Sequence, residues 1–489
     1  MQKVRVGVVG LGEVGQITHL PILQALGDRY EIGALCDISC ELLRSQGERY
    51  SVEKRYTDAG ELATQDDLDA VFVLNSDEYH AECTIAALEH GKHVLVEKPM
   101  CLTDAEADAI IAARDRAGKV VMVAYMRRYA PAFLRAVEEV RSLGNIRYAR
   151  VRDIIGQNRL IIDQSSIVHR PNDLPRDAIR DKQQRAERLG REAIGDRHEE
   201  FGGVYRLLCG LSSHDLSAMR ELLGMPERVL GAAVSERGRF ISVIFGYPGY
   251  NVMFETGTDS QRRFDAHIEV YGDSKSVRVQ YDTPYIRHLP TTLTVTQTVG
   301  EAYTEVVERP TYTDSYSREL EYFHEVVTTG GQPKTTPEDF KQDLQLFRMI
   351  IDSLSERSTD IAHDTKPPKQ EPIDNFWHTN SDGWPALRKE APMVEQLNYL
   401  LDQWERHNAL RNKQTDEICV DADTGVIKEK LTGDPTRLNY AQLGRLVDMH
   451  PQTVKTYIER YKKTGERDDR APGAGQGNRW NHYSSEQRP

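Results

Sequence analysis

The stretch at residues 93–100, HVLVEKPM, combines the pattern of a buried strand with charged residues that could take part in chemistry. Its first residues are mostly apolar and β-branched, as in a strand covered on both faces. Glu97, Lys98 and Pro99 follow at the strand's carboxyl end. A charge there is costly to bury unless it is used. Taken alone, Lys98 is either a solvated surface charge or a lysine that hydrogen-bonds a reacting oxygen, with Glu97 as its support.

A second candidate site is the glycine-rich turn GLGEVG, which directly follows the strand pattern VRVGVV and opens a helical pattern. Gly10 permits a tight turn, Gly12 lets the backbone approach a pyrophosphate, and Gly15 allows close packing of helix on strand. The start of the helix adds free N–H groups and a positive dipole. We therefore predict cofactor contacts from Gly10, Leu11, Gly12, Glu13, Val14 and Gly15.

Asp37 ends the second predicted strand, 22 residues after Gly15. A carboxylate at this spacing typically accepts hydrogen bonds from the adenosine ribose hydroxyls. The next residues, Ile38 and Ser39, include no Arg or Lys that could hold a 2′-phosphate. The sequence therefore favours NAD as cofactor, with NADP less favoured.

Composition limits the class of protein. The chain has 489 residues, of which 39% are hydrophobic and 28% charged, and its formal net charge is −13. This balance argues against a protein devoted to nucleic acid or to anionic membranes. The six cysteines form no C-x-x-C pair, so we expect neither a metal nor a disulfide framework. The chain opens on a strand pattern and has no long apolar run, which predicts a cytoplasmic protein without signal peptide or membrane span.

The elements that must position these residues alternate between strand and helix patterns in the first quarter of the chain. We predict strands at 4–9, 31–37, 69–75, 93–97 and 120–125, separated by helices. Such alternation is typical of an α/β fold with a doubly wound parallel sheet. We assign residues 1–127 to an NAD-binding Rossmann domain.

Residues 128–363 have a different pattern, in which strand-like stretches follow one another. This pattern predicts an α+β domain for substrate binding and oligomerisation. Six strand-like stretches between 146 and 282 indicate an open, largely antiparallel sheet. Residues 156–200 form an insertion that either covers the pocket as a lid or lies on the surface. A helix over 337–355 begins at Thr336 with a capping pattern and should pack back on the domain.

The last part of the chain predicts a helical extension. Residues 364–435 contain a proline-rich linker and a helical segment, and 466–489 read as a disordered tail. Between them, 436–465 hold two short helical patterns that resemble a helix-turn-helix. DNA binding through this unit is one interpretation, and a packing or dimerisation hairpin or a cover for the substrate site is the favoured alternative.

Together these features resemble the glucose–fructose oxidoreductase / inositol dehydrogenase / MocA (Gfo/Idh/MocA) family over residues 3–355. The resemblance rests on GLGEVG with HLP, NSDEYH (75–80), EKPM (97–100), YMRRYAP (125–131) and GLSSHDLSAMRELLG (210–224). It implies that Lys98 points between nicotinamide and substrate, that a cis peptide precedes Pro99, and that His214 is the active-site histidine.

The resemblance also extends the set of predicted site residues. Further cofactor contacts would come from Asn75, His80, Glu97, Lys98 and Arg128. Predicted substrate contacts are Lys98, Tyr125, Arg127, Tyr205 and His214, and the insertion at 156–200 adds Gln164 and His169 as candidates of its own. Lys98 and His214 would be the catalytic pair, because a histidine near neutrality suits a proton acceptor.

One departure from the family pattern affects the predicted chemistry. The family commonly carries an aspartate four residues before the histidine, where this chain has Gly210, and an acid three residues after it, where this chain has Ser217. Either Lys98 and His214 suffice, or another group replaces the lost carboxylate, or the protein binds without turnover. The candidate replacements are Tyr205, Tyr125 and Asp215.

The resulting expectation is an NAD-dependent dehydrogenase acting on a secondary alcohol of a sugar, sugar derivative or cyclitol. A homo-oligomer is expected through the open face of the antiparallel sheet. The alternative is a catalytically disabled, cofactor- or sugar-sensing regulator whose C-terminal unit binds DNA.

Overall fold

The computed structural model describes residues 2–361, 377–379 and 385–387. The chain divides into two units, Met1–His363 and Asp364–Pro489. In the second unit the described residues are two short paired strands, β15 (Trp377–Thr379) and β16 (Pro385–Leu387). The helix-turn-helix-like unit 436–465 and the tail 466–489 lie outside the described residues, so their roles stay predictions. Every helix in the described ranges is too short or too polar to cross a bilayer.

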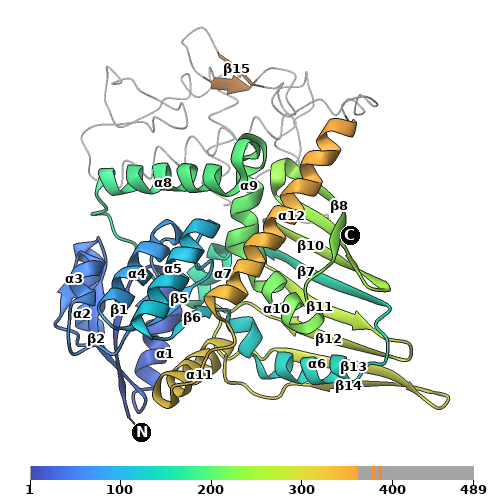
Figure 1. Cartoon of the computed structure of the whole chain (residues 1–489), viewed down its shortest axis with the longest axis horizontal. Helices are drawn as coiled ribbons and strands as arrows, with labels where there is room; N and C mark the ends of the chain where they lie inside the picture. Colours follow the sequence, from blue (N-terminus) through green and yellow to red (C-terminus); the bar gives the residue numbers. More distant parts are fainter. Residues whose placement is uncertain (1, 362–376, 380–384, 388–489) are drawn as a thin grey trace, which may run out of the picture. The chain divides into compact units, whose positions relative to one another are not determined.

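The first sheet of the larger unit is parallel throughout, with strand order β3-β2-β1-β4-β5-β6 (Figure 1). Its strands are β1 (Val4–Val9), β2 (Tyr30–Cys36), β3 (Arg55–Tyr56), β4 (Ala70–Val73), β5 (His93–Glu97) and β6 (Val121–Ala124). Both faces are buried: Val71 and Val73 of β4 join one apolar cluster, whereas Ala70 and Phe72 join another. Burial on both faces explains why these strands read as continuous apolar runs. The predicted doubly wound sheet is confirmed.

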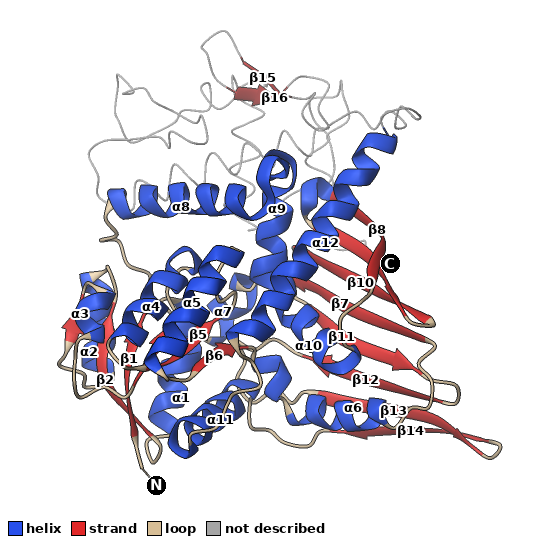
Figure 2. Ribbon diagram, viewed as in Figure 1, coloured by secondary structure: helices blue, strands red, loops and turns tan. Residues whose placement is uncertain are grey.

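Helices cover both faces of this sheet (Figure 2). The helices α4 (His80–Glu89) and α5 (Asp104–Ala117) contribute to the first cluster, and α1 (Leu20–Ala25) and α11 (Ser315–Thr329) contribute to the second. The helix α5 begins with the predicted capping box of Thr103 and Glu106 and ends at Gly118, whose φ is 61°. Local capping residues therefore fix where this helix begins and ends.

The second sheet has eight strands in the order β14-β13-β12-β11-β7-β10-β9-β8. Neighbouring strands are antiparallel, except that β7 and β10 run parallel. The strands are β7 (Tyr148–Gly156), β8 (Arg228–Ser235), β9 (Phe240–Tyr247), β10 (Tyr250–Asp259), β11 (Phe264–Tyr271), β12 (Lys275–Tyr281), β13 (Thr292–Val299) and β14 (Ala302–Glu308). The predicted open, largely antiparallel sheet is confirmed, and the hairpin β13–β14 is an addition to it.

The insertion at 156–200 folds into two helices, α7 (Arg159–Ser165) and α8 (Arg176–Ile194). An extended segment, residues 166–175, joins them. The long helix α12 (Pro337–Ile361) begins with the predicted cap, because the Asp339 N–H donates to the Thr336 hydroxyl at 3.2 Å. It contacts both α5 and β8, and so links the two sheets.

Strand order reverses between β1 and β4, so the loops after these strands diverge at the carboxyl edge of the parallel sheet. In open α/β sheets this reversal creates the crevice in which ligands bind. The glycine-rich turn follows β1, and Asn75 follows β4. The fold therefore brings the two predicted cofactor segments to one edge.

Candidate active site

The glycine-rich turn is shaped by close contact with the loop after β4. Gly10 has a φ of 95°, and a Cβ on Gly10 would lie 2.4 Å from the backbone nitrogen of Asn75. A Cβ on Gly15 would lie 2.9 Å from the carbonyl oxygen of Gly10. A Cβ on Gly12, by contrast, would meet no described atom within 4 Å. The turn is thus closed toward the protein and open at Gly12, which fits the approach of a dinucleotide pyrophosphate.

Asp37 is tied to this turn by backbone hydrogen bonds. Its Oδ2 accepts from the Leu11 N–H at 2.8 Å, and its Oδ1 accepts from the Ser39 N–H at 2.9 Å. Burial raises the pKa of Asp37, although these two N–H groups oppose the shift. The carboxylate therefore stands at the end of β2 in the place expected for a ribose ligand.

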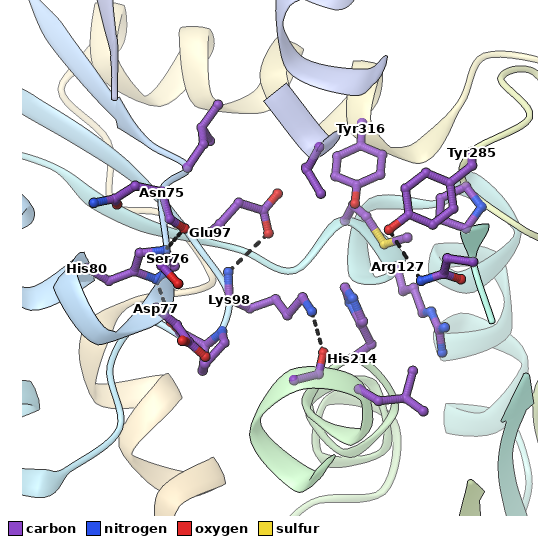
Figure 3. Close-up of a pocket in the computed structure, with 18 of the residues that line it drawn as sticks. Asn75, Ser76, Asp77, His80, Glu97, Lys98, Arg127, His214, Tyr285 and Tyr316 are labelled. Carbon is purple, nitrogen blue, oxygen red and sulfur yellow. Dashed lines mark hydrogen bonds between the residues drawn. The ribbon is translucent and has the colours of Figure 1, made fainter. Parts of the chain in front are cut away.

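A cavity of about 370 Å³ lies beside the carboxyl edge of the parallel sheet (Figure 3). Polar side chains from both halves of the larger unit line it: Asn75, Ser76, Asp77, His80, Glu97, Lys98, Arg127, Asn158, Lys182, Arg206, His214, Tyr285 and Tyr316. A concave site with convergent polar groups and shifted pKa values is the usual setting for catalysis.

Lys98 reaches across this cavity from the end of β5. Its Nζ donates to the carbonyl oxygen of Gly210 at 2.6 Å (Figure 3). The Lys98–Pro99 peptide is cis, as the family resemblance predicted. Glu97 is buried, contacts His19 Nε2 at 2.8 Å, and accepts the backbone N–H of Lys98 at 3.1 Å. Glu97 therefore supports the main chain of Lys98 and leaves its ammonium free to face the cavity.

His214 lies in the first turn of α10 (Ser213–Leu223) and faces the same cavity. Burial, followed by the positive charges of Lys98 and Arg127, holds the pKa of His214 well below its usual value. Among the described residues its Nδ1 has no hydrogen-bond partner. Removal from water likewise lowers the pKa of Lys98, against the opposing charge of Glu97. The neutral imidazole can accept a proton from a bound hydroxyl group, but its lowered pKa makes it a weaker base than the near-neutral histidine that the sequence predicted.

Gly210 sits in a π-helical turn, Leu208–Ser212, just before α10. Its carbonyl oxygen takes the hydrogen bond of Lys98, and a Cβ added to it would meet no described atom within 4 Å. Ser217, at the other departure from the family pattern, donates its hydroxyl to the carbonyl oxygen of His214 at 3.1 Å. The space in which the side chain of the expected aspartate would lie is thus open. The Gly210 carbonyl oxygen, instead of a carboxylate, accepts the hydrogen bond of Lys98.

The predicted replacements for that aspartate all point elsewhere. The Tyr125 hydroxyl donates to Asp343, and the Tyr205 hydroxyl donates to the Leu102 carbonyl oxygen at 2.5 Å. Asp215 accepts a hydrogen bond from Arg127. None of the three lines the cavity, because each is buried in a polar contact behind its wall.

Asp77 is a carboxylate that does line the cavity, within the NSDEYH segment. Its Oδ1 accepts from Arg206 at 2.9 Å. Burial works against ionisation, but the Arg206 guanidinium prevails and lowers the pKa of Asp77. Asp77 and Glu97 both line the cavity, and the negative charge of each opposes the lowering of the Lys98 pKa.

Arg127 and Arg128 follow β6 and join the two sheets. Arg127 lines the cavity but is buried in ion pairs with Asp153, at 3.3 Å, and with Asp215. Arg128 pairs with Glu221 at 2.6 Å and with Asp339, and it is absent from the cavity lining. The structure thus places Arg127 at the edge of the predicted substrate site and Arg128 outside the cavity.

The structure brings only some of the predicted site residues together. Gln164 is exposed on α7 and absent from the cavity lining, and His169 pairs through its backbone with Gln16. Conversely, the sequence did not single out Asn158, Lys182, Arg206, Tyr285 or Tyr316, which line the cavity. No local motif marks these five residues, since they come from separate elements that meet only in the fold.

Comparison with known proteins agrees with this geometry. Residues 4–125 match the family model GFO_IDH_MocA, described as an oxidoreductase family with an NAD-binding Rossmann fold. The myo-inositol 2-dehydrogenase of Thermotoga maritima is 28% identical over 373 residues, which cover 72% of this chain and 97% of that protein. Residues 4–125 belong to the Gfo/Idh/MocA family of oxidoreductases. The relatives of the chain are named dehydrogenases, and it is an enzyme of this class.

Solved structures show the same fold for this chain. A levoglucosan dehydrogenase in complex with NADH and levoglucosan has a TM-score of 0.57 and 18% identity, covering 73% of this chain and 98% of that one. A 3-ketoreductase of Actinomadura kijaniata in complex with NADP has a TM-score of 0.54 and 18% identity, again covering 73% and 98%. Since the two hold different dinucleotides, the fold alone leaves the choice between NAD and NADP open.

Proposed function

We propose that this chain is an NAD-dependent oxidoreductase that interconverts a secondary alcohol and its ketone in a sugar, sugar derivative or cyclitol. The observation that carries the proposal is the meeting of Lys98 and His214 in one cavity at the edge of the dinucleotide-binding sheet. The names of a myo-inositol 2-dehydrogenase and a levoglucosan dehydrogenase among its relatives support a cyclic polyol as substrate.

The two side chains divide the work at the reacting oxygen. The Lys98 ammonium would leave the Gly210 carbonyl and donate to the substrate hydroxyl, holding its oxygen in place. The neutral His214 would accept the hydroxyl proton as the carbon–oxygen bond becomes a carbonyl. The nicotinamide of the bound cofactor accepts the hydride in this direction and returns it in the other.

The choice of NAD rests on Asp37 and on the two residues after it. Its carboxylate is held by two backbone N–H groups at the end of β2, and Ile38 and Ser39 carry no positive charge. Hydroxyl groups at the ribose can donate to this carboxylate, whereas a 2′-phosphate would be repelled. Asp37→Ala should therefore weaken NAD binding, and an unchanged affinity would contradict this role.

Turnover of purified protein with NAD and a panel of inositols and aldoses, followed by absorbance of reduced nicotinamide, tests the reaction. Lys98→Ala should lower kcat roughly 10³-fold, the scale expected for a lost acid–base or electrostatic group. NAD binding by calorimetry should stay within about threefold. Lys341→Ala, which removes a surface ion pair with Asp108, is the matched control. Turnover by Lys98→Ala at the wild-type rate would sink the assignment.

We also propose that the protein is a homo-oligomer. The helix α6 (Pro131–Arg141) packs against β12 and β13. A shallow hollow of about 700 Å³ on this part of the sheet is lined by residues such as Tyr271, Tyr303 and Val307, which are exposed. The other residues that line the hollow are polar or charged, and an open sheet face of this mixed kind can pair with the same face of a second copy. Light scattering should give a mass above 55.6 kDa, and Tyr303→Glu should lower it.

A further inference from the structure

The extended segment 166–175, between α7 and α8, is fastened to the cofactor side of the molecule (Figure 1). Gln16, in the helix after the glycine turn, donates to the His169 carbonyl oxygen and accepts the His169 N–H, both at 2.9 Å. Arg170 pairs with Glu13 of the glycine turn at 2.9 Å. The insertion therefore reaches the dinucleotide-binding elements as well as the cavity.

Three residues further on, the segment places a carboxylate at the start of the helix α2 (Cys40–Arg49). Asp173 Oδ1 accepts from the Ser39 hydroxyl at 2.5 Å, and its Oδ2 accepts from the Glu41 N–H at 2.9 Å. The Ser39 hydroxyl, followed by the Glu41 N–H, lowers the pKa of Asp173, so this group is an anion. It uses the hydrogen-bond donors that a helix N-terminus otherwise offers to a bound anion.

Asp173 also stands next to the predicted ribose ligand. Ser39 lies between two carboxylates: its N–H donates to Asp37 at 2.9 Å and its hydroxyl donates to Asp173 at 2.5 Å. A 2′-phosphate on the adenosine ribose would enter here, beside Asp37 and at the start of α2. In a protein that binds NADP, positive groups and free N–H donors would be needed at this place.

The positive side chains of the same segment are already engaged by acids. His169 Nε2 lies 3.7 Å from a Glu41 carboxylate oxygen. Arg170 contacts both Glu13 and Asp163 at 2.9 Å. Among the described residues Asp173 has no ion-pair partner. The segment thus brings a carboxylate, rather than an unpaired cation, to the place expected for the adenosine ribose.

We propose that Asp173 is a cofactor-specificity residue, which occupies the place of the 2′-phosphate and so selects NAD against NADP. The inference rests on the proposed function, because it assumes that the glycine turn and Asp37 bind a dinucleotide. A 2′-hydroxyl fits beside the two carboxylates and can donate to Asp37. A 2′-phosphate must displace Asp173 from Ser39 and Glu41 and remain near two negative charges.

Calorimetric titration of the full chain with NAD and with NADP tests the proposal without requiring turnover. Asp173→Asn keeps the shape of the side chain and removes its charge. The ratio of the Kd for NADP to the Kd for NAD should fall about tenfold, as expected for loss of one nearby like charge. Asp173→Lys should shift the ratio further in the same direction. Asp177→Asn is the control, since Asp177 lies in the first turn of α8 and pairs with Arg180 at 3.3 Å.

The outcomes separate this role from a purely structural one. If Asp173 only fastens the segment to α2, Asp173→Asn lowers the melting temperature and leaves the NADP-to-NAD ratio within twofold of wild type, which overturns the proposal. A changed ratio with Asp177→Asn unchanged supports it. Failure of the proposed function has a different signature, because it would show as absence of polyol-dependent reduction of NAD while the binding ratio is still measured.

Discussion

The cofactor side and the substrate side of the proposed active site each contain a glycine, Gly10 in the glycine-rich turn and Gly210 in the wall of the cavity, and the fold constrains the two differently. Gly10, on the cofactor side, has a positive φ, and a Cβ there would collide with the backbone of Asn75 at 2.4 Å. Gly210, on the substrate side, lies in a π-helical turn where a Cβ would meet no described atom within 4 Å. The backbone requires the first glycine and only tolerates the second.

This difference shows which side of the site tolerates a change of side chain and which does not. On the cofactor side, the glycine turn donates the Leu11 N–H to the Asp37 carboxylate and packs at Gly10 against the backbone of Asn75, so a change in the turn disturbs both contacts. On the substrate side, Lys98 is served by a carbonyl oxygen, and the space expected to hold a carboxylate is open. A side chain can therefore be added at position 210 without a change of fold.

The largest stability effect is expected where the two sides are joined. Arg127 is 2% exposed, pairs with the fully buried Asp153 and Asp215, and lies 5.1 Å from the Tyr281 ring centroid. Arg127→Met should destabilise the protein by about 3–5 kcal/mol, because it leaves buried carboxylates without a partner. Urea denaturation followed by circular dichroism measures this loss.

The matched control for Arg127→Met is a substitution of Arg135, an arginine on the surface of α6. Arg135 is half-exposed, and its three ion pairs span 3.5–3.9 Å. Arg135→Met should change stability by less than about 1 kcal/mol, as is usual for exposed pairs. Equal losses in the two variants would mean that the buried arginine does not hold the two sides together.

Replacing each glycine by alanine should have a smaller effect on stability, and the effect should differ between the two positions. Gly10→Ala should cost roughly 3 kcal/mol, since it combines a positive φ with a backbone clash. Gly210→Ala should be neutral or stabilise the protein by up to about 1 kcal/mol, because a helical position gains from losing glycine. Thermal denaturation and NAD titration of both variants measure these effects. A Gly10→Ala protein that melts and binds NAD like wild type would remove the distinction drawn between the two sides.

The same contrast explains how far the sequence alone could lead. The parallel sheet, the glycine turn and Asp37 were predictable because each lies in one contiguous pattern with a known geometric consequence. The hairpin β13–β14 was missed, although the alternation of Thr with Leu293 and Val295 in β13 is itself a strand pattern. Tyr125 and Tyr205 belong to the segments that suggested the family, yet the fold directs their hydroxyls away from the cavity, to Asp343 and to the Leu102 carbonyl oxygen.

The residues that line the substrate side could not be predicted from the sequence, for a physical reason. Asn158, Tyr285 and Tyr316 reach the cavity from separate elements, and only packing of the two sheets brings them together. Asp173 is more than a hundred residues from Ser39 in the sequence, and no local pattern marks their contact. Sites built from one loop are visible in sequence, whereas sites built from several elements require the structure.

The smallest predicted effect concerns pH and sharpens the role of His214. Its pKa in the folded protein is well below the ordinary value near 6.5, so below that pH the unfolded chain binds a proton that the folded protein does not. Folding stability must therefore fall as pH decreases through about 6.5, by roughly 1 kcal/mol per pH unit. His214→Gln lacks this group, so its stability relative to wild type should rise between pH 7.5 and pH 5.5. Carboxyl groups titrate in both proteins and cancel in the difference, and His90→Gln, at an exposed position just after α4, is the control. If the difference between His214→Gln and wild type is the same at both pH values, burial does not lower the pKa of His214, and the electrostatic description of the site is wrong.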